Sequence, residues 1–237
     1  MKQTFKYEMH LHTAACSGCA QSTGESFVMR AKKLGFSGFV MTNHFYHGNS
    51  TVDRSLPWKD FVGAYAKDYE ETKRIAKDYD IDVFFGFEEG YGEKGYHYLV
   101  YGLSPDTVAS APEFPQMSLA EIYDFVHKNG GFAAFAHPYR DLSALNEPGP
   151  YPDMRYADAI EVYNAGNSEE SNRLASEYAA RTGVKTISGS DTHNIHSFGQ
   201  GGLAFEKRLY TSEKMVENLF LGRYNIIVAG QEKGRVL

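Results

Sequence analysis

Short apolar segments alternate along the chain with segments of helical periodicity. The apolar segments predict strands at residues 5–12, 38–44, 82–89, 96–103, 132–138, 159–164, 184–193 and 225–230. Strands that alternate with helices are typical of an α/β domain built on a parallel sheet. We therefore predict one domain over residues 1–237, with either a parallel barrel or a doubly wound sheet.

Helix starts and loops are marked by short motifs. The capping-box patterns Ser22-x-x-Glu25 and Ser118-x-x-Glu121 predict two helix starts. Residues 169–182 predict a further helix, which a glycine follows. Residues 48–56 and 141–153 are rich in Ser, Gly, Asn and Pro and predict loops rather than linkers between domains.

Polar residues gather at the carboxyl ends of the predicted strands. They are His10, His12, Asn43, His44, Glu88, Glu89, His137, Asn164, Asp191 and His193. In a parallel barrel these strand ends meet on one face, so we expect the side chains to share a pocket. Because so many imidazoles and carboxylates are costly to bury without a cation, the pattern predicts a cluster of divalent metal ions.

Composition and charge narrow the possible partners. Hydrophobic residues make up 42% of the 237 residues and charged residues 23%, as in an ordinary globular protein. Residues 1–10 lack the apolar run of a signal peptide, and no segment is long and apolar enough to span a membrane, so we expect a cytoplasmic protein. The net charge of −6 disfavours long nucleic acids, whereas a small phosphorylated substrate needs only one or two local arginines.

The segment from His10 to Cys19 combines two pairs of metal-binding residue types. His10 and His12 are two residues apart, so on a strand both side chains face the same side and can bind one ion. Cys16 and Cys19 leave three interpretations open: metal ligands, a redox pair, or small loop residues. Thiolate ligands would favour zinc over manganese or magnesium. A redox pair usually opens a helix in a thioredoxin-like unit, and this segment has no such context.

In this order, the motifs resemble those of the PHP family, named for polymerase and histidinol phosphatase. The matches are His10-Leu11-His12, Thr42-Asn43-His44, Gly86-Phe87-Glu88, His97, His137-Pro138 and Gly189-Ser190-Asp191-Thr192-His193. The resemblance covers nearly the whole chain. It implies a distorted TIM-like (β/α)7 barrel, two or three divalent metal ions (Zn, Mn or Fe), and hydrolysis of a phosphoester.

The resemblance also implies a ligand set for each ion. The first ion would bind His10, His12, Glu88 and Asp191; the second would share Glu88 and add His97 and His137; the third would bind His44, His193 and a residue from the loop after His12. Ser17 stands where the family usually has an acid or a histidine. Either Cys16 or Cys19 completes the third site as a thiolate, or the third site is weak or empty.

Two of these ligands raise a question of strand geometry. Adjacent strand residues face opposite sides, and motif spacing selects Glu88 rather than Glu89 as the bridging ligand. His97 lies near the beginning of its predicted strand, whereas the other ligands lie near strand ends. Its assignment therefore rests on the resemblance.

The predicted function is metal-dependent hydrolysis of a small phosphomonoester, such as histidinol phosphate, a nucleotide or a sugar phosphate. Arg140 follows His137 closely and would clamp the phosphate with its guanidinium. Asp191 would hold the ions that activate water, and His193 would protonate the leaving group. One alternative is amidohydrolase-type cleavage of a C–N bond, and the other is a non-catalytic metal-binding regulatory module. The sequence does not predict the oligomeric state.

Overall fold

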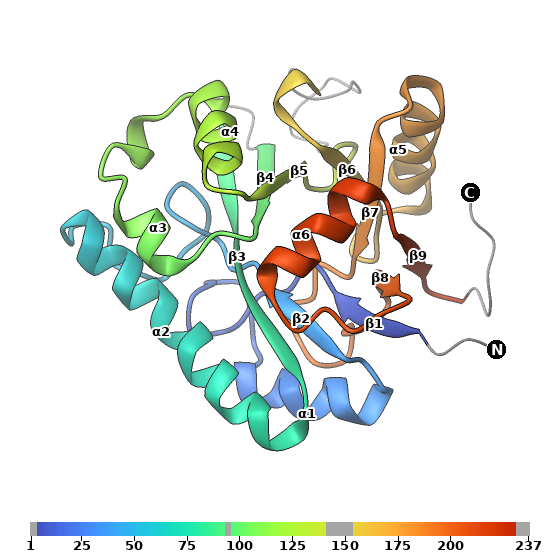
Figure 1. Ribbon diagram of the computed structural model, residues 1–237, viewed down its shortest axis with the longest axis horizontal. Coiled ribbons are helices and arrows are strands. Elements are labelled where there is room, and N and C mark those ends of the chain that lie inside the picture. The colour runs from blue at the N-terminus through green and yellow to red at the C-terminus, as the bar shows by residue number, and fades with distance from the viewer. Residues whose placement is uncertain (1–3, 93–95, 141–153, 231–237) are drawn as a thin grey trace.

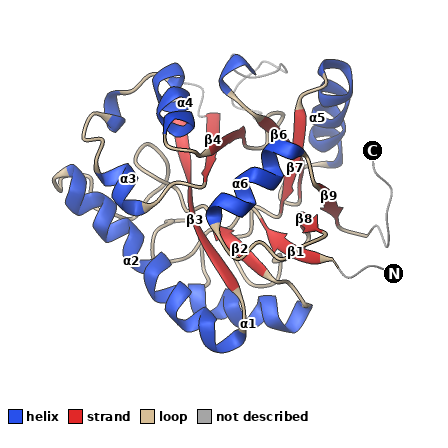
Figure 2. Ribbon diagram, viewed as in Figure 1, coloured by secondary structure: helices blue, strands red, loops and turns tan. Residues whose placement is uncertain are grey.

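A computed structural model describes residues 4–92, 96–140 and 154–230, and the loop predicted at 141–153 lies outside this part of the chain. The strands are β1 (Phe5–Glu8), β2 (Gly38–Met41), β3 (Asp82–Tyr91), β4 (Tyr96–Tyr101), β5 (Phe132–Phe135), β6 (Ala159–Asn164), β7 (Lys185–Gly189), β8 (Gly201–Phe205) and β9 (Tyr224–Val228). The α-helices are α1 (Gly24–Leu34), α2 (Trp58–Ala76), α3 (Pro105–Ala109), α4 (Leu119–Lys128), α5 (Glu169–Thr182) and α6 (Ser212–Leu221). The strands lie at the centre of the molecule with the helices around them (Figures 1 and 2).

The described strands form one sheet that curls into a nearly closed barrel. Their order is β7-β6-β5-β4-β3-β2-β1-β8-β9. The two edges of the sheet approach each other, because the Ser188 hydroxyl of β7 donates to the Ile227 carbonyl of β9 at 2.7 Å. Just beyond the strand ends, Leu11 and Thr192 form a parallel bridge. The predicted TIM-like α/β barrel is therefore confirmed.

The barrel is not parallel throughout. β4 runs antiparallel to β3 and β5, and β8 runs antiparallel to β1 and β9, so the expectation of a uniformly parallel sheet is wrong. The connection between β3 and β4 is too short for the crossover that a parallel pair needs. As a result, the amino end of β4 lies beside the carboxyl end of β3. His97 pairs with Gly90 there, at the edge where the other predicted ligands gather.

Strand boundaries also differ from the prediction. The segments expected at 5–12, 38–44, 132–138 and 184–193 end earlier in the structure, and the predicted ligands lie in the turns that follow. β8 was not predicted, because its two glycines are poor strand formers. A Cβ on Gly202, which has a φ of 128°, would lie 2.3 Å from the Tyr7 carbonyl oxygen. Close pairing with β1 therefore requires glycine at this position.

One predicted helix start is confirmed and the other is displaced by one residue. Ser118 caps α4, and the Glu121 carboxylate accepts from the Ser118 amide at 2.7 Å, which completes the capping box. α1 is capped by Thr23 rather than Ser22, because the Ser22 hydroxyl accepts from the Ile195 amide at 3.1 Å. α6 was not predicted, and Thr211 caps it.

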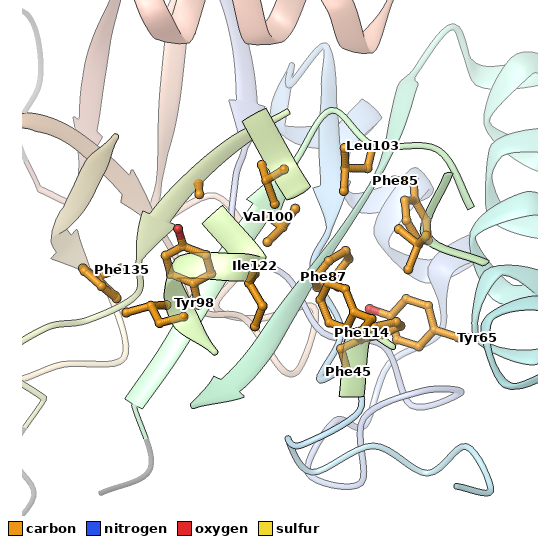
Figure 3. Packing of buried hydrophobic residues seen from close by; sticks show 14 of the residues in the cluster. Phe45, Tyr65, Phe85, Phe87, Tyr98, Val100, Leu103, Phe114, Ile122 and Phe135 are labelled. Atoms are coloured by element: carbon orange, nitrogen blue, oxygen red, sulfur yellow. The ribbon is translucent and has the colours of Figure 1, made fainter. Parts of the chain in front are cut away.

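Aromatic residues fill the space between the sheet and helices α2, α3 and α4 (Figure 3). The rings of Phe45 and Phe87 stack with their centroids 4.5 Å apart, and Phe114 packs edge-on against both. Burial of each phenylalanine stabilises the fold by about 1.5–3 kcal/mol. Phe87 precedes Glu88 on β3, so this cluster supports the strand that carries the central carboxylate of the site.

Among the described residues, no helix is long and apolar enough to cross a membrane.

Candidate metal centre

All eight predicted metal ligands meet at one end of the barrel, in a group that we call the cage. Its members are His10, His12, His44, Glu88, His97, His137, Asp191 and His193. They form overlapping groups of three whose possible ligand atoms lie within 4.8 Å of one another. The side chains come from the ends of strands β1, β2, β3, β5 and β7 and from the beginning of β4. The reversed direction of β4 explains how His97 joins ligands from the other strand ends.

Glu88 lies at the centre of the cage and divides it into two lobes. Its Oε1 atom lies 2.8 Å from His97 Nδ1, 3.1 Å from His137 Nε2 and 3.3 Å from His10 Nε2. These three histidines form the Oε1 lobe. The Oε2 atom lies 2.7 Å from His44 Nδ1 and 3.5 Å from His12 Nε2, which with His193 form the Oε2 lobe.

Of two further carboxylates near Glu88 in the fold or the sequence, Asp191 belongs to the cage and Glu89 does not. Asp191 Oδ1 lies 3.4 Å from His10 Nε2 and 3.3 Å from His12 Nε2, so it spans the two lobes. Glu89 faces elsewhere and accepts from His47 Nδ1 at 2.9 Å. Of the two adjacent acids, Glu88 is therefore the one that faces the cage.

The cage contains buried polar atoms that hydrogen bonds do not satisfy. Within the described part of the chain, His10 Nε2, His12 Nε2, His44 Nδ1 and Glu88 Oε2 have no hydrogen-bond partner. His44 Nδ1 and Glu88 Oε2 are close, but their angles do not suit a hydrogen bond. Leaving such a group unsatisfied costs about 1–3 kcal/mol. Divalent cations would satisfy all four atoms, so the donor set fits metal ions.

The electrostatics of the cage also fit bound metal ions. Burial works to lower the pKa of His10, but the carboxylates of Asp191, Glu161 and Glu88 outweigh burial and raise this pKa well above its usual value. At His12 burial dominates and lowers the pKa to about 3, so this ring is neutral and able to donate its lone pair. The carboxylates therefore produce a negative electrostatic potential at the centre of the cage, which bound metal ions would compensate.

Two cage residues have strained backbone conformations. His137 has a φ of 30° and Asp191 a φ of 50°, in the left-handed region that residues other than glycine rarely adopt. Strain of this kind costs on the order of 1–3 kcal/mol and is concentrated at functional sites. In this structure His137 Nε2 lies 3.1 Å from Glu88 Oε1, and Asp191 Oδ1 lies 3.4 Å from His10 Nε2.

Sequence reasoning missed two buried acids that support the cage from behind. Glu161 of β6 accepts from His10 Nδ1 at 3.0 Å and from the His137 amide at 2.9 Å. Glu8 accepts from the amides of His10 and Ser190 at 3.1 and 2.8 Å, and burial raises its pKa to about 7. Each acid interrupts an apolar strand pattern, which was the available signal. Together they join the segments that carry His10, His137 and Asp191.

The loop after His12 supports the cage without contributing a ligand. Ser17 Oγ accepts from His12 Nδ1 at 3.1 Å and from the His44 amide at 3.0 Å, and it donates to Asn43 Oδ1 at 3.0 Å. Ser17 therefore orients His12. The expected third ligand set of His44, His193 and a loop residue is replaced by a group in which His12 joins His44 and His193.

Neither cysteine belongs to a possible ligand group in the described residues, so the geometry favours the interpretation of Cys16 and Cys19 as loop residues. Cys16 is 2% exposed, packs in the aromatic cluster and donates to the Tyr65 carbonyl at 3.5 Å. Burial raises its pKa to about 12. Cys19 is exposed, and partial burial raises its pKa as well. Both thiols are therefore protonated near pH 7.

We expect the double variant Cys16→Ala/Cys19→Ala to bind as many metal ions as the unsubstituted protein. Because Cys16 fills space in the core, its truncation should lower the free energy of unfolding by about 1 kcal/mol. Elemental analysis and denaturant unfolding measure the two effects separately. Loss of an ion from the double variant would show that a thiol is a ligand after all.

Arg140 lies at the rim of the cage. Its Nη1 atom is 3.4 Å from His137 Nε2 and 3.9 Å from Asp191 Oδ2. The side chain is 45% exposed, unlike those of its two neighbours, which are almost fully buried. A guanidinium in this position can contact both the cage and a ligand that enters from solvent.

Comparison with known proteins agrees with the order of the motifs. Residues 169–224 match the family model described as PHP-associated. A two-domain protein from Bacteroides vulgatus, described as containing a predicted PHP-like metal-dependent phosphoesterase, superposes with a TM-score of 0.71 at 16% identity. The alignment covers 96% of this chain and 65% of that protein. The match of residues 169–224 and the fold of this neighbour support the resemblance of the chain to the PHP family.

Two other solved structures share this barrel fold. PsfC from Pseudomonas syringae has a TM-score of 0.66 at 14% identity, over 97% of this chain and 93% of PsfC. An amidohydrolase from Chromobacterium violaceum has a TM-score of 0.53 at 14% identity, over 92% of this chain and 96% of that one. At such identities the similarity shows the fold alone. A comparison with curated protein sequences gave no significant match.

Proposed function

We propose that this protein is a hydrolase of the PHP family that uses two or three divalent metal ions to cleave a small phosphomonoester. The main support is the convergence of six histidines on the carboxylates of Glu88 and Asp191, which makes eight possible ligands in all. A structural metal site needs about four ligands, so eight favour a centre that binds several ions. Nitrogen and oxygen donors suit Zn, Mn or Fe. When bound, such ions polarise a phosphoryl group and lower the pKa of a coordinated water.

The ligands divide naturally between ions. His10, His12, Glu88 and Asp191 would hold one ion, and His97 and His137 would hold a second with Glu88 as the bridge. His12, His44 and His193 would hold a third. This last set has three imidazoles, and the Glu88 carboxylate beside it would be shared with the other ions, which favours weaker binding there.

The other residues would bind and orient the substrate. Arg140, beside His137 and Asp191, would neutralise phosphoryl oxygens as charge moves toward the leaving group. His193 Nδ1 donates to the Asp191 carbonyl at 2.9 Å, which leaves Nε2 to exchange a proton with the departing alkoxide when that atom is free of metal. Asp191 and Glu88 would hold the ions in place around the phosphate.

We expect Arg140→Ala to lower kcat/KM for a phosphomonoester by about 10–100-fold, because a charge-assisted hydrogen bond is worth about 1.5–3 kcal/mol. Metal content should not change, since Arg140 lies outside the cage. Arg140→Lys should recover part of the activity, because it restores the charge without the two-point contact. Arg181→Ala on α5 is a control for loss of a surface arginine. Equal loss in Arg140→Ala and Arg181→Ala would contradict the proposed role.

The test of the reaction class is a parallel assay of phosphate release and of ammonia or amine release. The protein would be loaded with Zn²⁺, Mn²⁺ or Fe²⁺ and offered histidinol phosphate, nucleotides, sugar phosphates and a panel of amides. Phosphate release that depends on metal and on Asp191 would support the proposal. Amine release instead would favour the amidohydrolase alternative. The Chromobacterium violaceum protein, which is described as an amidohydrolase, has a similar fold. Metal binding with neither activity would favour a regulatory module.

A further inference from the structure

We propose that Glu161 is a positioning residue that makes the Oε1 lobe, whose histidines would serve the first and second ions, bind metal more tightly than the Oε2 lobe. This inference rests on the proposed metal-dependent function and goes beyond it, because it assigns the two lobes unequal affinities. The support comes from the residues that contact each lobe from behind. Glu161 is not a ligand itself, since both of its oxygens are engaged with other groups.

Glu161 receives three hydrogen bonds that converge from different strand ends. Its Oε1 accepts from His10 Nδ1 at 3.0 Å. Its Oε2 accepts from the His137 amide at 2.9 Å and from Asn164 Nδ2 at 2.8 Å. Asn164 Nδ2 also lies 3.3 Å from Asp191 Oδ2. One buried side chain therefore contacts two cage residues directly and a third through Asn164.

The contact with His10 determines which ring atom faces the ions. A carboxylate accepts hydrogen bonds only, so His10 Nδ1 must carry the proton and Nε2 must carry the lone pair. Nε2 is the atom that points at Glu88 Oε1 and Asp191 Oδ1 without a hydrogen-bond partner. Carboxylates that hold a metal-binding histidine in this way typically raise metal affinity by 10–100-fold.

The local sequence is built around this contact. A register shift in β6 between Glu161 and Tyr163 places Glu161 and Asn164 on the same side of the strand, although they are three residues apart. On the facing strand, a Cβ at Gly189 would lie 2.4 Å from His10 Cβ and 2.7 Å from Glu161 Oε1. Glycine at this position therefore leaves the space in which the carboxylate meets the ring.

In the described part of the chain, neutral groups accept the hydrogen bonds of His12 and His193 in the Oε2 lobe. His12 Nδ1 is bonded to the Ser17 hydroxyl, and Ser17 is bonded in turn to the Asn43 side-chain oxygen. His193 Nδ1 donates to a backbone carbonyl. These groups also fix ring orientation. The Asp191 carboxylate lies 3.7 Å from His193 Nδ1, but it belongs to the cage itself, and no acid outside the cage contacts His12 or His193 among the described residues. The two lobes therefore differ both in their ligands and in the charge of the groups that support the ligands.

The experiment is a calorimetric titration of dialysed full-length protein with Zn²⁺. We expect two classes of site in the unsubstituted protein. In Glu161→Gln we expect the affinity of the tighter class to fall by about 10–100-fold and that of the weaker class to stay unchanged. A glutamine has one oxygen for the three donors that Glu161 satisfies, so its amide would oppose a donor. His193→Ala is the control, and it should weaken only the weaker class, because His193 would serve only the third ion.

Each outcome decides a specific point. If the unsubstituted protein binds no metal, the proposed function fails. If it binds two classes and Glu161→Gln alters neither, or only the weaker one, the inference about Glu161 is wrong. Because Glu161→Gln could unfold the protein, the tautomer of His10 in the unsubstituted, Zn²⁺-loaded protein provides an independent test by ¹⁵N NMR of the histidine rings. A proton on Nδ1 supports the inference, and a proton on Nε2 overturns it.

Discussion

Glu88→Gln is expected to abolish metal binding in both lobes and to lower hydrolytic activity by more than about 100-fold. Loss of a residue that only supports a ligand already costs about 10–100-fold, so loss of a central ligand should exceed that range. Five imidazole nitrogens, from His10, His12, His44, His97 and His137, lie within 3.5 Å of the Glu88 oxygens. An amide at this position carries no charge to hold two ions together. Elemental analysis and an activity assay measure the two effects.

The neighbouring acid provides a matched control for this substitution. Glu89 is equally buried, but its carboxylate accepts from His47 Nδ1 and from the amides of Tyr46 and His47. Glu89→Gln should therefore destabilise the loop after β2 and leave the metal content unchanged. Retention of metal by Glu88→Gln, or equal loss of metal in both variants, would contradict the role given to Glu88.

The gathering of the cage residues at one end of the barrel could be predicted from sequence, because position along a strand determines position in a barrel. His10 and His12 were expected on one face, and both Nε2 atoms do approach the Asp191 carboxylate. The strands end earlier than predicted, yet the side chains still meet. The turns that follow β5 and β7 continue in strained conformations that no apolar pattern indicates.

The direction of strand β4 was harder to predict than the positions of the strands along the chain. His97 looked misplaced because its strand was assumed to run parallel to its neighbours. Antiparallel pairing of β4 with β3 brings the beginning of that strand to the ligand edge. A short connection after an apolar strand was the available sign of a hairpin.

Proximity in sequence was misleading for the cysteines. A turn after His12, in which the Ser17 amide donates to the Thr13 carbonyl at 2.9 Å, directs Cys16 into the aromatic core and Ser17 toward His12. Residues one position apart thus have opposite surroundings. The supporting acids Glu8 and Glu161 could be noticed as isolated charges in apolar strands, but their partners come from distant segments and required the fold.

Removal of metal is expected to lower the thermal stability of the protein as well as its activity. A ligand present at 100 to 1,000 times its Kd stabilises the folded state by about 2.7–4.1 kcal/mol, which for a domain of this size corresponds to about 5–15 °C in Tm. The structural reason is the set of buried, unpartnered atoms at His10, His12, His44 and Glu88. A chelator such as EDTA should therefore lower the Tm measured by calorimetry, and added Zn²⁺ or Mn²⁺ should restore it.

Glu88→Gln gives this prediction its control, because a variant without bound metal should show no change of Tm when chelator is added. A chelator that removes the ions from the unsubstituted protein without lowering its Tm would mean that the ions bind outside the buried cage. Loss of both activity and stability over the same range of chelator concentration would place the catalytic ions and the stabilising ions in one site. That result would show that the ions bound by the unsatisfied polar atoms of the cage are the same ions that the proposed hydrolysis requires.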